Sequence, residues 1–351
     1  MRKTTLFARS FSLLLAVLAV SSQAYSQQQN PPTDPGAENQ DDVIRVNTTL
    51  VTVTVSARDH HGKIVTNLRR EDFRLLEDGS EQDIVYFEAP KEAGDALSVS
   101  SLPFTVALLL DVSDSAEFKL KQIQEAAIAF IDQLQADDRV LIIAFDKRVR
   151  VLAEATTDRT VLREAIKRTQ TGGGTSLYSA VDIVLNDRLK NISGRKAIVL
   201  FTDGVDTASV GATLDGTVSA AAKSDAVIYP VQYNTYSDFA DNPSRESAAG
   251  VFGSLAHATR NGELASEAYK RATQYLRLLA EITGGHVEYS DSLKNLSRAF
   301  GRIALHLRQQ YTLGYYPKNK AANGLQRQIK VHVAKPEVVV GARKSYVYAP
   351  R

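Results

Sequence analysis

Uninterrupted apolar runs alternate with helical segments through the middle of this chain, and this alternation constrains the fold more than any other feature. Four runs read as buried strands, at 104–110, 140–145, 197–201 and 226–232. Strands of this kind are typical of parallel sheets that are covered by helices on both faces. Because the intervening segments have a helical period, the pattern predicts an α/β fold with a doubly wound, mostly parallel sheet.

The connecting segments complete this predicted layer structure. Two more strands are expected at 149–152, as an antiparallel edge, and at 286–289. The expected helices span 117–135, 159–168, 176–188, 213–223, 264–282 and 291–309. The polar stretch 233–262 has no clear period, and a loop of this length in a compact domain is usually functional or disordered. It should lie at the rim where the strands end.

Both flanks of this region are rich in β-formers. Residues 43–90 contain several short strands and an Asp78-Gly79 turn, and residues 311–348 contain three more strand-like runs. Each flank is too small to bury a core by itself. We therefore expect an N-terminal β segment (43–100) to pair with a C-terminal β segment (311–351) in a small β-sandwich, with the α/β domain (101–310) inserted between them.

The N-terminus has the pattern of an export signal. Residues 1–26 combine a cationic start, an apolar run and small residues, which predicts a cleaved signal peptide; an uncleaved anchor is the alternative. Residues 27–42 lack large apolar side chains and are predicted to be a disordered linker. The mature protein is expected to be secreted or periplasmic, with no stable membrane insertion after signal cleavage.

Charge and cysteine content exclude several classes of protein. The net charge is +2, and residues 1–26 hold three of the basic residues and no acidic one, so signal removal leaves −1. No nucleic-acid partner is expected from such a balance. The absence of Cys excludes disulfides and thiolate metal sites. The six histidines are scattered apart from His60 and His61, which favour a solvated turn over a zinc ligand pair.

Three polar segments fall at or beside strand ends, and they carry the chemistry. They are 111–115 (Asp-Val-Ser-Asp-Ser), 172–176 (Gly-Gly-Gly-Thr-Ser) and 202–204 (Thr-Asp-Gly). Alternate side chains of an extended loop point the same way, so Asp111, Ser113 and Ser115 can converge. The glycines permit positive φ and would place the Thr175 hydroxyl. An all-oxygen site with few carboxylates suits Mg²⁺ or Mn²⁺, with Ca²⁺ as a further candidate.

In their order and spacing, these segments resemble the metal-ion-dependent adhesion site of von Willebrand factor A domains. The resemblance covers residues 103 to about 310, and the flanks resemble acidobacterial-type secreted proteins that carry this domain. It implies Ser113, Ser115 and Thr175 as direct metal ligands, and Asp111 and Asp203 as water-mediated or switching ligands. Asp114, Glu117 and Asp206 are expected to be rim charges rather than ligands.

Enzyme motifs are missing from the sequence. It contains no Gly-x-Ser-x-Gly elbow, no phosphate-binding Gly-x-x-x-x-Gly-Lys-Ser/Thr loop and no Gly-x-Gly-x-x-Gly. A phosphatase of the haloacid-dehalogenase type would need Asp where Ser113 stands. We therefore expect a non-enzymatic, metal-dependent module that captures an Asp or Glu carboxylate of a partner protein. A structural envelope scaffold with a loop-stiffening metal, or a non-catalytic enzyme subunit, are the alternatives.

Overall fold

The computed structural model describes residues 50–90, 103–113, 120–233, 265–290, 293–320 and 324–348. All of them belong to one compact unit, Asn47–Arg351. Within these ranges, no helix combines the length and the apolar character needed to cross a membrane. The predicted signal peptide, the linker and nearly all of the 233–262 loop lie outside the described residues.

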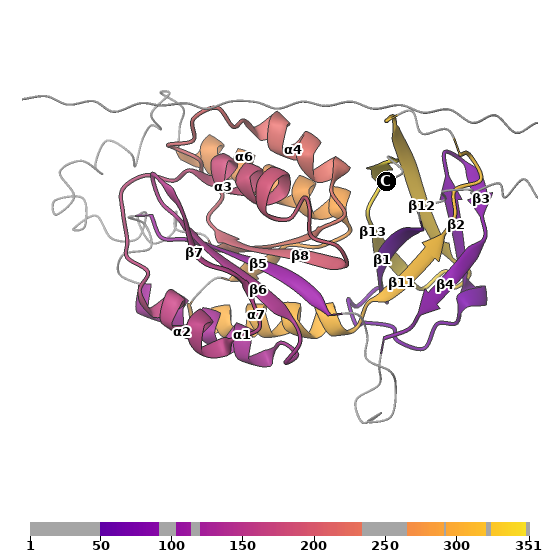
Figure 1. Ribbon diagram of the computed structural model, residues 1–351, viewed down its shortest axis with the longest axis horizontal. Helices are drawn as coiled ribbons and strands as arrows, with labels where there is room; N and C mark the ends of the chain where they lie inside the picture. Colours follow the sequence, from indigo (N-terminus) through magenta and orange to yellow (C-terminus); the bar gives the residue numbers. More distant parts are fainter. Residues whose placement is uncertain are drawn as a thin grey trace, which may run out of the picture. The chain divides into compact units, whose positions relative to one another are not determined.

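A six-stranded sheet forms the centre of the α/β region, in the order β10-β9-β8-β5-β6-β7. Figure 1 labels four of its strands, β5 to β8. The strands of this sheet are β5 (Phe104–Asp111), β6 (Arg139–Phe145), β7 (Val149–Thr156), β8 (Arg195–Thr202), β9 (Val227–Tyr233) and β10 (Glu288–Ser290). Neighbours run parallel except β7, which is antiparallel to β6. The predicted α/β fold class with its mostly parallel sheet is therefore confirmed, including the antiparallel edge.

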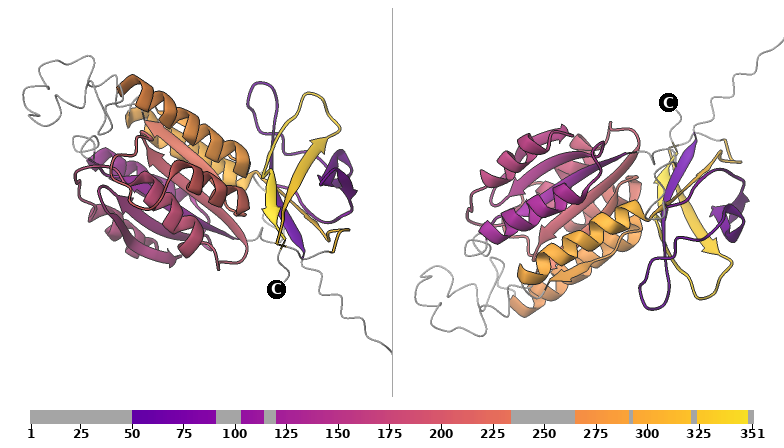
Figure 2. Two further views of the ribbon diagram at one scale, coloured as in Figure 1. Left: turned by 90° about the horizontal axis from the view of Figure 1, so that it is seen from above. Right: turned by 90° about the horizontal axis from the view of Figure 1, so that it is seen from below.

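Helices cover both faces of this sheet (Figures 1 and 2). The face under β5 and β6 packs on α1 (Leu120–Gln133), α2 (Arg159–Lys167) and α7 (Leu293–Arg308). The other face packs on α3 (Leu177–Ile183), α4 (Leu214–Lys223) and α6 (Ala265–Thr283). A π-helical turn, Val184–Arg188, extends α3. Since helices bury both faces, every residue of β5 is buried, as its apolar run predicts.

Local sequence signals set the ends of several helices. The Asp158 carboxylate accepts hydrogen bonds from the amides of Thr160 and Val161 at the start of α2. The Thr213 hydroxyl accepts one from the Gly216 amide at the start of α4. Such caps satisfy amides that have no partner inside the helix. At the end of α6, Gly284 adopts φ +84°, which a side chain would disfavour.

The two flanks of the chain pair strand by strand into two four-stranded sheets, β13-β1-β11-β4 and β14-β12-β2-β3. The N-terminal strands are β1 (Val51–Arg58), β2 (Phe73–Glu77), β3 (Ser80–Gln82) and β4 (Ile84–Glu88). The C-terminal strands are β11 (Tyr311–Tyr315), β12 (Gln326–Val333), β13 (Val339–Ala342) and β14 (Ser345–Val347). One apolar cluster joins the sheets, with the Phe73 and Tyr311 rings 5.1 Å apart. Each flank thus supplies strands to both sheets.

Two details differ from the sequence-based expectation. The run 338–348 is not one strand: it breaks between β13 and β14, which belong to different sheets. At the break, the Lys344 amide donates to the Ile282 carbonyl at the end of α6, so the backbone leaves one sheet before it joins the other. The predicted strand 63–65 forms only an isolated bridge between Arg58 and Ile64.

Candidate metal site

Three loop segments meet at the carboxyl end of the central strands. Asp111 ends β5 and Thr202 ends β8, and the two strands are paired up to Leu110 and Phe201. The glycine loop (172–176) is hydrogen-bonded to the segments that follow β5 and β8. The Gly172 amide donates to the Val112 carbonyl (3.0 Å), and the Thr175 carbonyl accepts from the amides of residues 207 and 208 (2.9 Å each). This sheet edge is where open α/β folds bind ligands.

The Asp111 carboxylate is buried and held on both of its oxygens. Its Oδ1 accepts hydrogen bonds from the Ser113 hydroxyl (2.6 Å) and the Ser113 amide (3.1 Å). Its Oδ2 accepts one from the Thr202 hydroxyl (2.6 Å). Only 3% of Asp111 is exposed. These hydrogen bonds fix the positions of the Asp111 carboxylate and the Ser113 hydroxyl, whose oxygens could both bind a metal ion.

A second carboxylate, that of Asp203, lies close enough to repel the first. Burial, followed by the Asp203 charge, raises the pKa of Asp111 to about 7. Asp203 Oδ1 accepts a hydrogen bond from the Val205 amide (3.0 Å), and Tyr269 of α6 donates to its Oδ2 (3.4 Å). Two buried anions in one place favour either a proton or a cation between them.

The raised pKa of Asp111 predicts a pH dependence for the metal-free protein. Below about pH 4 this carboxyl is protonated in both the folded and unfolded states, so it has no effect on their balance. As the pH rises toward about 7, the unfolded state ionises while the folded state resists, and folding stability is lost. In EDTA, we expect thermal melting of wild type to fall from pH 5 to pH 8 more steeply than that of Asp111→Asn. Parallel profiles would contradict this.

The glycine loop is shaped by an acidic residue that sequence analysis did not single out. Asp146 follows β6, is 5% exposed, and forms an ion pair with Arg150 (2.6 Å). A Cβ on Gly172 would overlap the Asp146 carboxylate. Gly174 needs its positive φ of +75°, as the glycine-rich sequence predicts. Asp146 and the absent side chain at Gly172 together set the path of the loop toward Thr175.

Gly172→Ala should therefore displace this loop. We expect Mg²⁺ uptake to weaken by about tenfold or more, since loss of a supporting contact around a metal typically costs that much. Isothermal titration with Mg²⁺ measures the effect. Gly62→Ala, in a remote turn, has open space around it but a positive φ (+81°) that Gly172 does not have, so it controls for the general cost of replacing a glycine. Equal metal affinity in both variants would show that the loop path does not matter.

The structure places four of the five expected ligands. Asp111, Ser113, Thr175 and Asp203 are all buried, in the three segments that meet at this edge. Ser115 lies outside the described residues, as do Asp114 and Glu117. The Asp206 carboxylate accepts from the Tyr178 amide (3.1 Å) and the Ser209 hydroxyl (2.5 Å), so it holds the start of α3.

Two residues that support the site were not among the five predicted ligands, although Thr202 belongs to the predicted segment 202–204. Besides its bond to Asp111, the Thr202 hydroxyl accepts one from the Gly204 amide (3.0 Å) and so couples the ends of β5 and β8. Gln232, at the end of β9, donates to the Asp203 carbonyl (3.3 Å). The sequence does indicate a special position for Thr202, because this polar residue directly follows the apolar run 197–201. No such indication exists for Gln232, because its role depends on the neighbouring strand.

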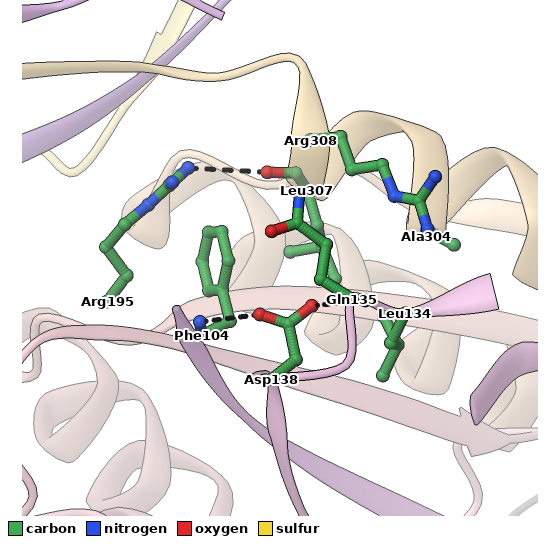
Figure 3. A pocket seen from close by; sticks show the side chains of 8 residues that line it. All are labelled: Phe104, Leu134, Gln135, Asp138, Arg195, Ala304, Leu307 and Arg308. Carbon is green, nitrogen blue, oxygen red and sulfur yellow. Dashed lines mark hydrogen bonds between the residues drawn. The ribbon is translucent and has the colours of Figure 1, made fainter. Parts of the chain in front are cut away.

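A small cavity at the opposite end of the sheet has a structural explanation (Figure 3). It lies where β5 and β8 begin, with the Arg195 guanidinium 4.0 Å from the centre of the Phe104 ring. Asp138 accepts hydrogen bonds there from the amides of Phe104 (2.8 Å) and Gln135 (2.9 Å). These contacts fix the strand starts, far from the three polar segments.

Comparison with known proteins identifies the α/β region. Residues 106–205 match the family model described as von Willebrand factor type A domain. The uncharacterised protein sll0103 of Synechocystis sp. (strain ATCC 27184 / PCC 6803 / Kazusa) is 34% identical over 107 residues. That match covers 29% of this chain and 26% of the relative, so the chain spans about a quarter of the relative's length.

Two solved structures are similar at lower identity. One is the vWF domain of the type V pili tip protein Mfa5 from Porphyromonas gingivalis, with 13% identity, a TM-score of 0.44, and coverage of 60% of this chain and 96% of that one. The other is proximal thread matrix protein 1 from the mussel byssus, with a zinc-occupied MIDAS motif: 13% identity, a TM-score of 0.43, and coverage of 61% and 47%. The family match begins in β5 and ends just beyond Asp203, on a sheet of the expected topology, and residues 106–205 of this chain therefore match a von Willebrand factor type A domain.

Proposed function

We propose that this protein is an extracytoplasmic, metal-dependent module that binds a partner protein through a carboxylate of that partner. Von Willebrand factor type A domains are generally non-catalytic protein-interaction modules. The sequence of this chain contains five oxygen-bearing residues that such a role would use. The observation that supports the proposal best is the buried Asp111 carboxylate, bonded to Ser113 and close to Asp203 where β5 ends. The export-type pattern of residues 1–26 supports the location.

The residues fit a hard divalent cation. Asp111, Ser113, Ser115, Thr175 and Asp203 would hold Mg²⁺ or Mn²⁺, with Ca²⁺ as a further candidate, because all of them offer oxygen. The ion would supply positive charge that its own ligands neutralise only in part. Three of the five ligands are neutral hydroxyls, so an external carboxylate is a favourable additional ligand.

The chain itself prepares the site before any partner arrives. Thr202 and the Ser113 amide orient Asp111, the Tyr269 hydroxyl and the Val205 amide orient Asp203, and the glycine loop carries Thr175. Because these contacts exist within the folded chain, little ordering is left for the moment of binding. The proposed recognition is thus electrostatic, with specificity supplied by the surrounding loops.

Metal-dependent capture tests the proposal. Full-length protein, immobilised and incubated with an extracytoplasmic extract, should retain a partner in Mg²⁺ and release it in EDTA, while its own fold persists in both. A partner retained equally in EDTA would contradict the proposal. Loss of the fold in EDTA would instead favour the structural scaffold, and enzymatic activity that arises only in the captured complex would favour a non-catalytic subunit.

A further inference from the structure

Two histidines that are distant in sequence meet beside the last strand of the central sheet. His286 and Glu288 are separated by one residue and so lie on the same side of an extended segment. His306 comes from α7. One ligand atom from each of the three residues lies within 4.8 Å of the other two. Among the described residues, these three form the one group of three or more histidine, aspartate or glutamate side chains that is compact enough to hold a metal ion.

The hydrogen bonds define the present state of this cluster. Arg58 of β1 donates to His286 Nδ1, so that nitrogen carries no proton. His286 Nε2 therefore carries the proton and donates to Glu288 Oε1 (3.0 Å). Arg302 donates twice to Glu288 Oε2 (2.8 and 2.6 Å), which leaves Oε1 facing the histidine. Nδ1 of His306 is buried and has no hydrogen-bond partner among the described residues.

We propose that His286, Glu288 and His306 form a second metal site, which takes Zn²⁺ or a similar borderline divalent ion and is occupied only when Arg58 leaves His286. Two imidazoles and one carboxylate are a ligand set that suits zinc, in contrast to the all-oxygen site at Asp111. The fourth position would be taken by water.

The protein around the cluster favours metal binding in two respects. His306 Nδ1 is buried without a hydrogen-bond partner among the described residues, so a bound ion would supply the contact that this nitrogen lacks. Arg302 fixes the orientation of the Glu288 carboxylate, as hydrogen-bond partners of metal ligands commonly do. Tetrahedral zinc with bonds of about 2.0–2.1 Å places its ligand atoms roughly 3.3 Å apart. The three ligand atoms here already lie within 4.8 Å of one another.

Arg58 opposes metal binding for a specific reason. A neutral imidazole that binds a metal through one nitrogen carries its proton on the other. Whichever nitrogen of His286 binds the ion, Nδ1 can no longer accept a hydrogen bond from Arg58. The guanidinium also repels the cation directly. Metal binding and the contact between β1 and His286 are therefore mutually exclusive, and the site links zinc to the contact between the β-sandwich and the α/β region.

Zn²⁺ titration of the full chain carrying Asp111→Asn tests this site apart from the proposed function, because that substitution disables the Asp111 site. We expect one zinc ion to bind, with affinity reduced at least tenfold by His306→Gln or by Glu288→Gln. Arg58→Met should raise the affinity at least tenfold. Co²⁺ provides a second readout, since the visible absorption of a histidine-bound tetrahedral ion differs from that of an octahedral all-oxygen site.

His332→Gln, at an exposed position of β12, is the matched control and should leave zinc binding unchanged. The proposal is overturned if the Asp111→Asn chain takes up no zinc, if uptake persists undiminished in both His306→Gln and Glu288→Gln, or if Arg58→Met fails to tighten binding. Far-UV circular dichroism verifies that each variant is folded. If either His306→Gln or Glu288→Gln does not fold, the other variant alone tests the loss of a ligand.

Discussion

Asp111→Asn should abolish the stabilisation of this protein by Mg²⁺ while leaving the metal-free fold intact. A ligand present at 100 times its dissociation constant stabilises the folded state by about 2.7 kcal/mol. For a domain of this size, that corresponds to a rise in melting temperature of roughly 5–10 °C. We expect this rise in wild type and none in the variant, because the amide supplies no negative charge to the cation.

The melting temperature of Asp111→Asn without metal tests the repulsion between the Asp111 and Asp203 carboxylates separately from metal binding. In wild type, burial and then repulsion by the Asp203 carboxylate raise the pKa of Asp111 to about 7. An amide at position 111 keeps an oxygen for Ser113 but removes the repulsion. At pH 8 in EDTA, the variant should therefore melt no lower than wild type.

Asp132→Asn is a suitable control for this experiment. Asp132 lies on α1, half exposed and paired with Arg163 (2.7 Å), away from the candidate site. That variant should keep the full response to Mg²⁺ in differential scanning fluorimetry. If Asp111→Asn retains the same response, Asp111 does not hold the ion and the proposed function loses its basis.

Arg327→Met should produce the largest loss of stability among the substitutions considered. Arg327 of β12 and Glu77 of β2 form an ion pair (2.7 Å), and their side chains are 3% and 2% exposed. The other Glu77 oxygen accepts hydrogen bonds from the hydroxyls of Tyr315 (2.7 Å) and Tyr346 (2.6 Å). Removing the arginine leaves a buried carboxylate without its cation, which typically costs about 3–5 kcal/mol.

A double substitution separates the charge effect from the packing effect. Glu77→Leu combined with Arg327→Met removes both charges and should recover much of the lost stability, as replacement of buried ion pairs by apolar groups often does. Arg74→Met, which breaks the exposed pair with Glu81 on the neighbouring strands, is the control and should have no measurable effect. Urea denaturation of the three variants compares them directly. A loss for Arg327→Met no larger than for Arg74→Met would show that the buried pair is not important for stability.

The fold class followed from the sequence because each contribution to it is local. An apolar run is a strand buried on both faces wherever helices cover it, and β5, β6, β8 and β9 all match their predicted runs within a few residues. The same holds for the helices, whose period and caps lie within single segments. The prediction was wrong at 338–348, where the contact of Lys344 with Ile282 breaks the strand, and nothing within that segment indicates the contact.

By itself, the sequence determined that parallel strands would end beside Asp111 and Asp203 and that Thr175 would lie in a glycine loop, since strand ends and glycine loops are properties of short segments. Only the tertiary structure decided which distant side chains share a buried space. Glu77 and Arg327 are 250 residues apart, and Arg58 reaches His286 across 228. Nothing in the sequence relates His286 to His306, which meet because α7 packs beside β10. Partners of this kind depend on the topology that connects segments, and periodicity within a segment carries no information about it.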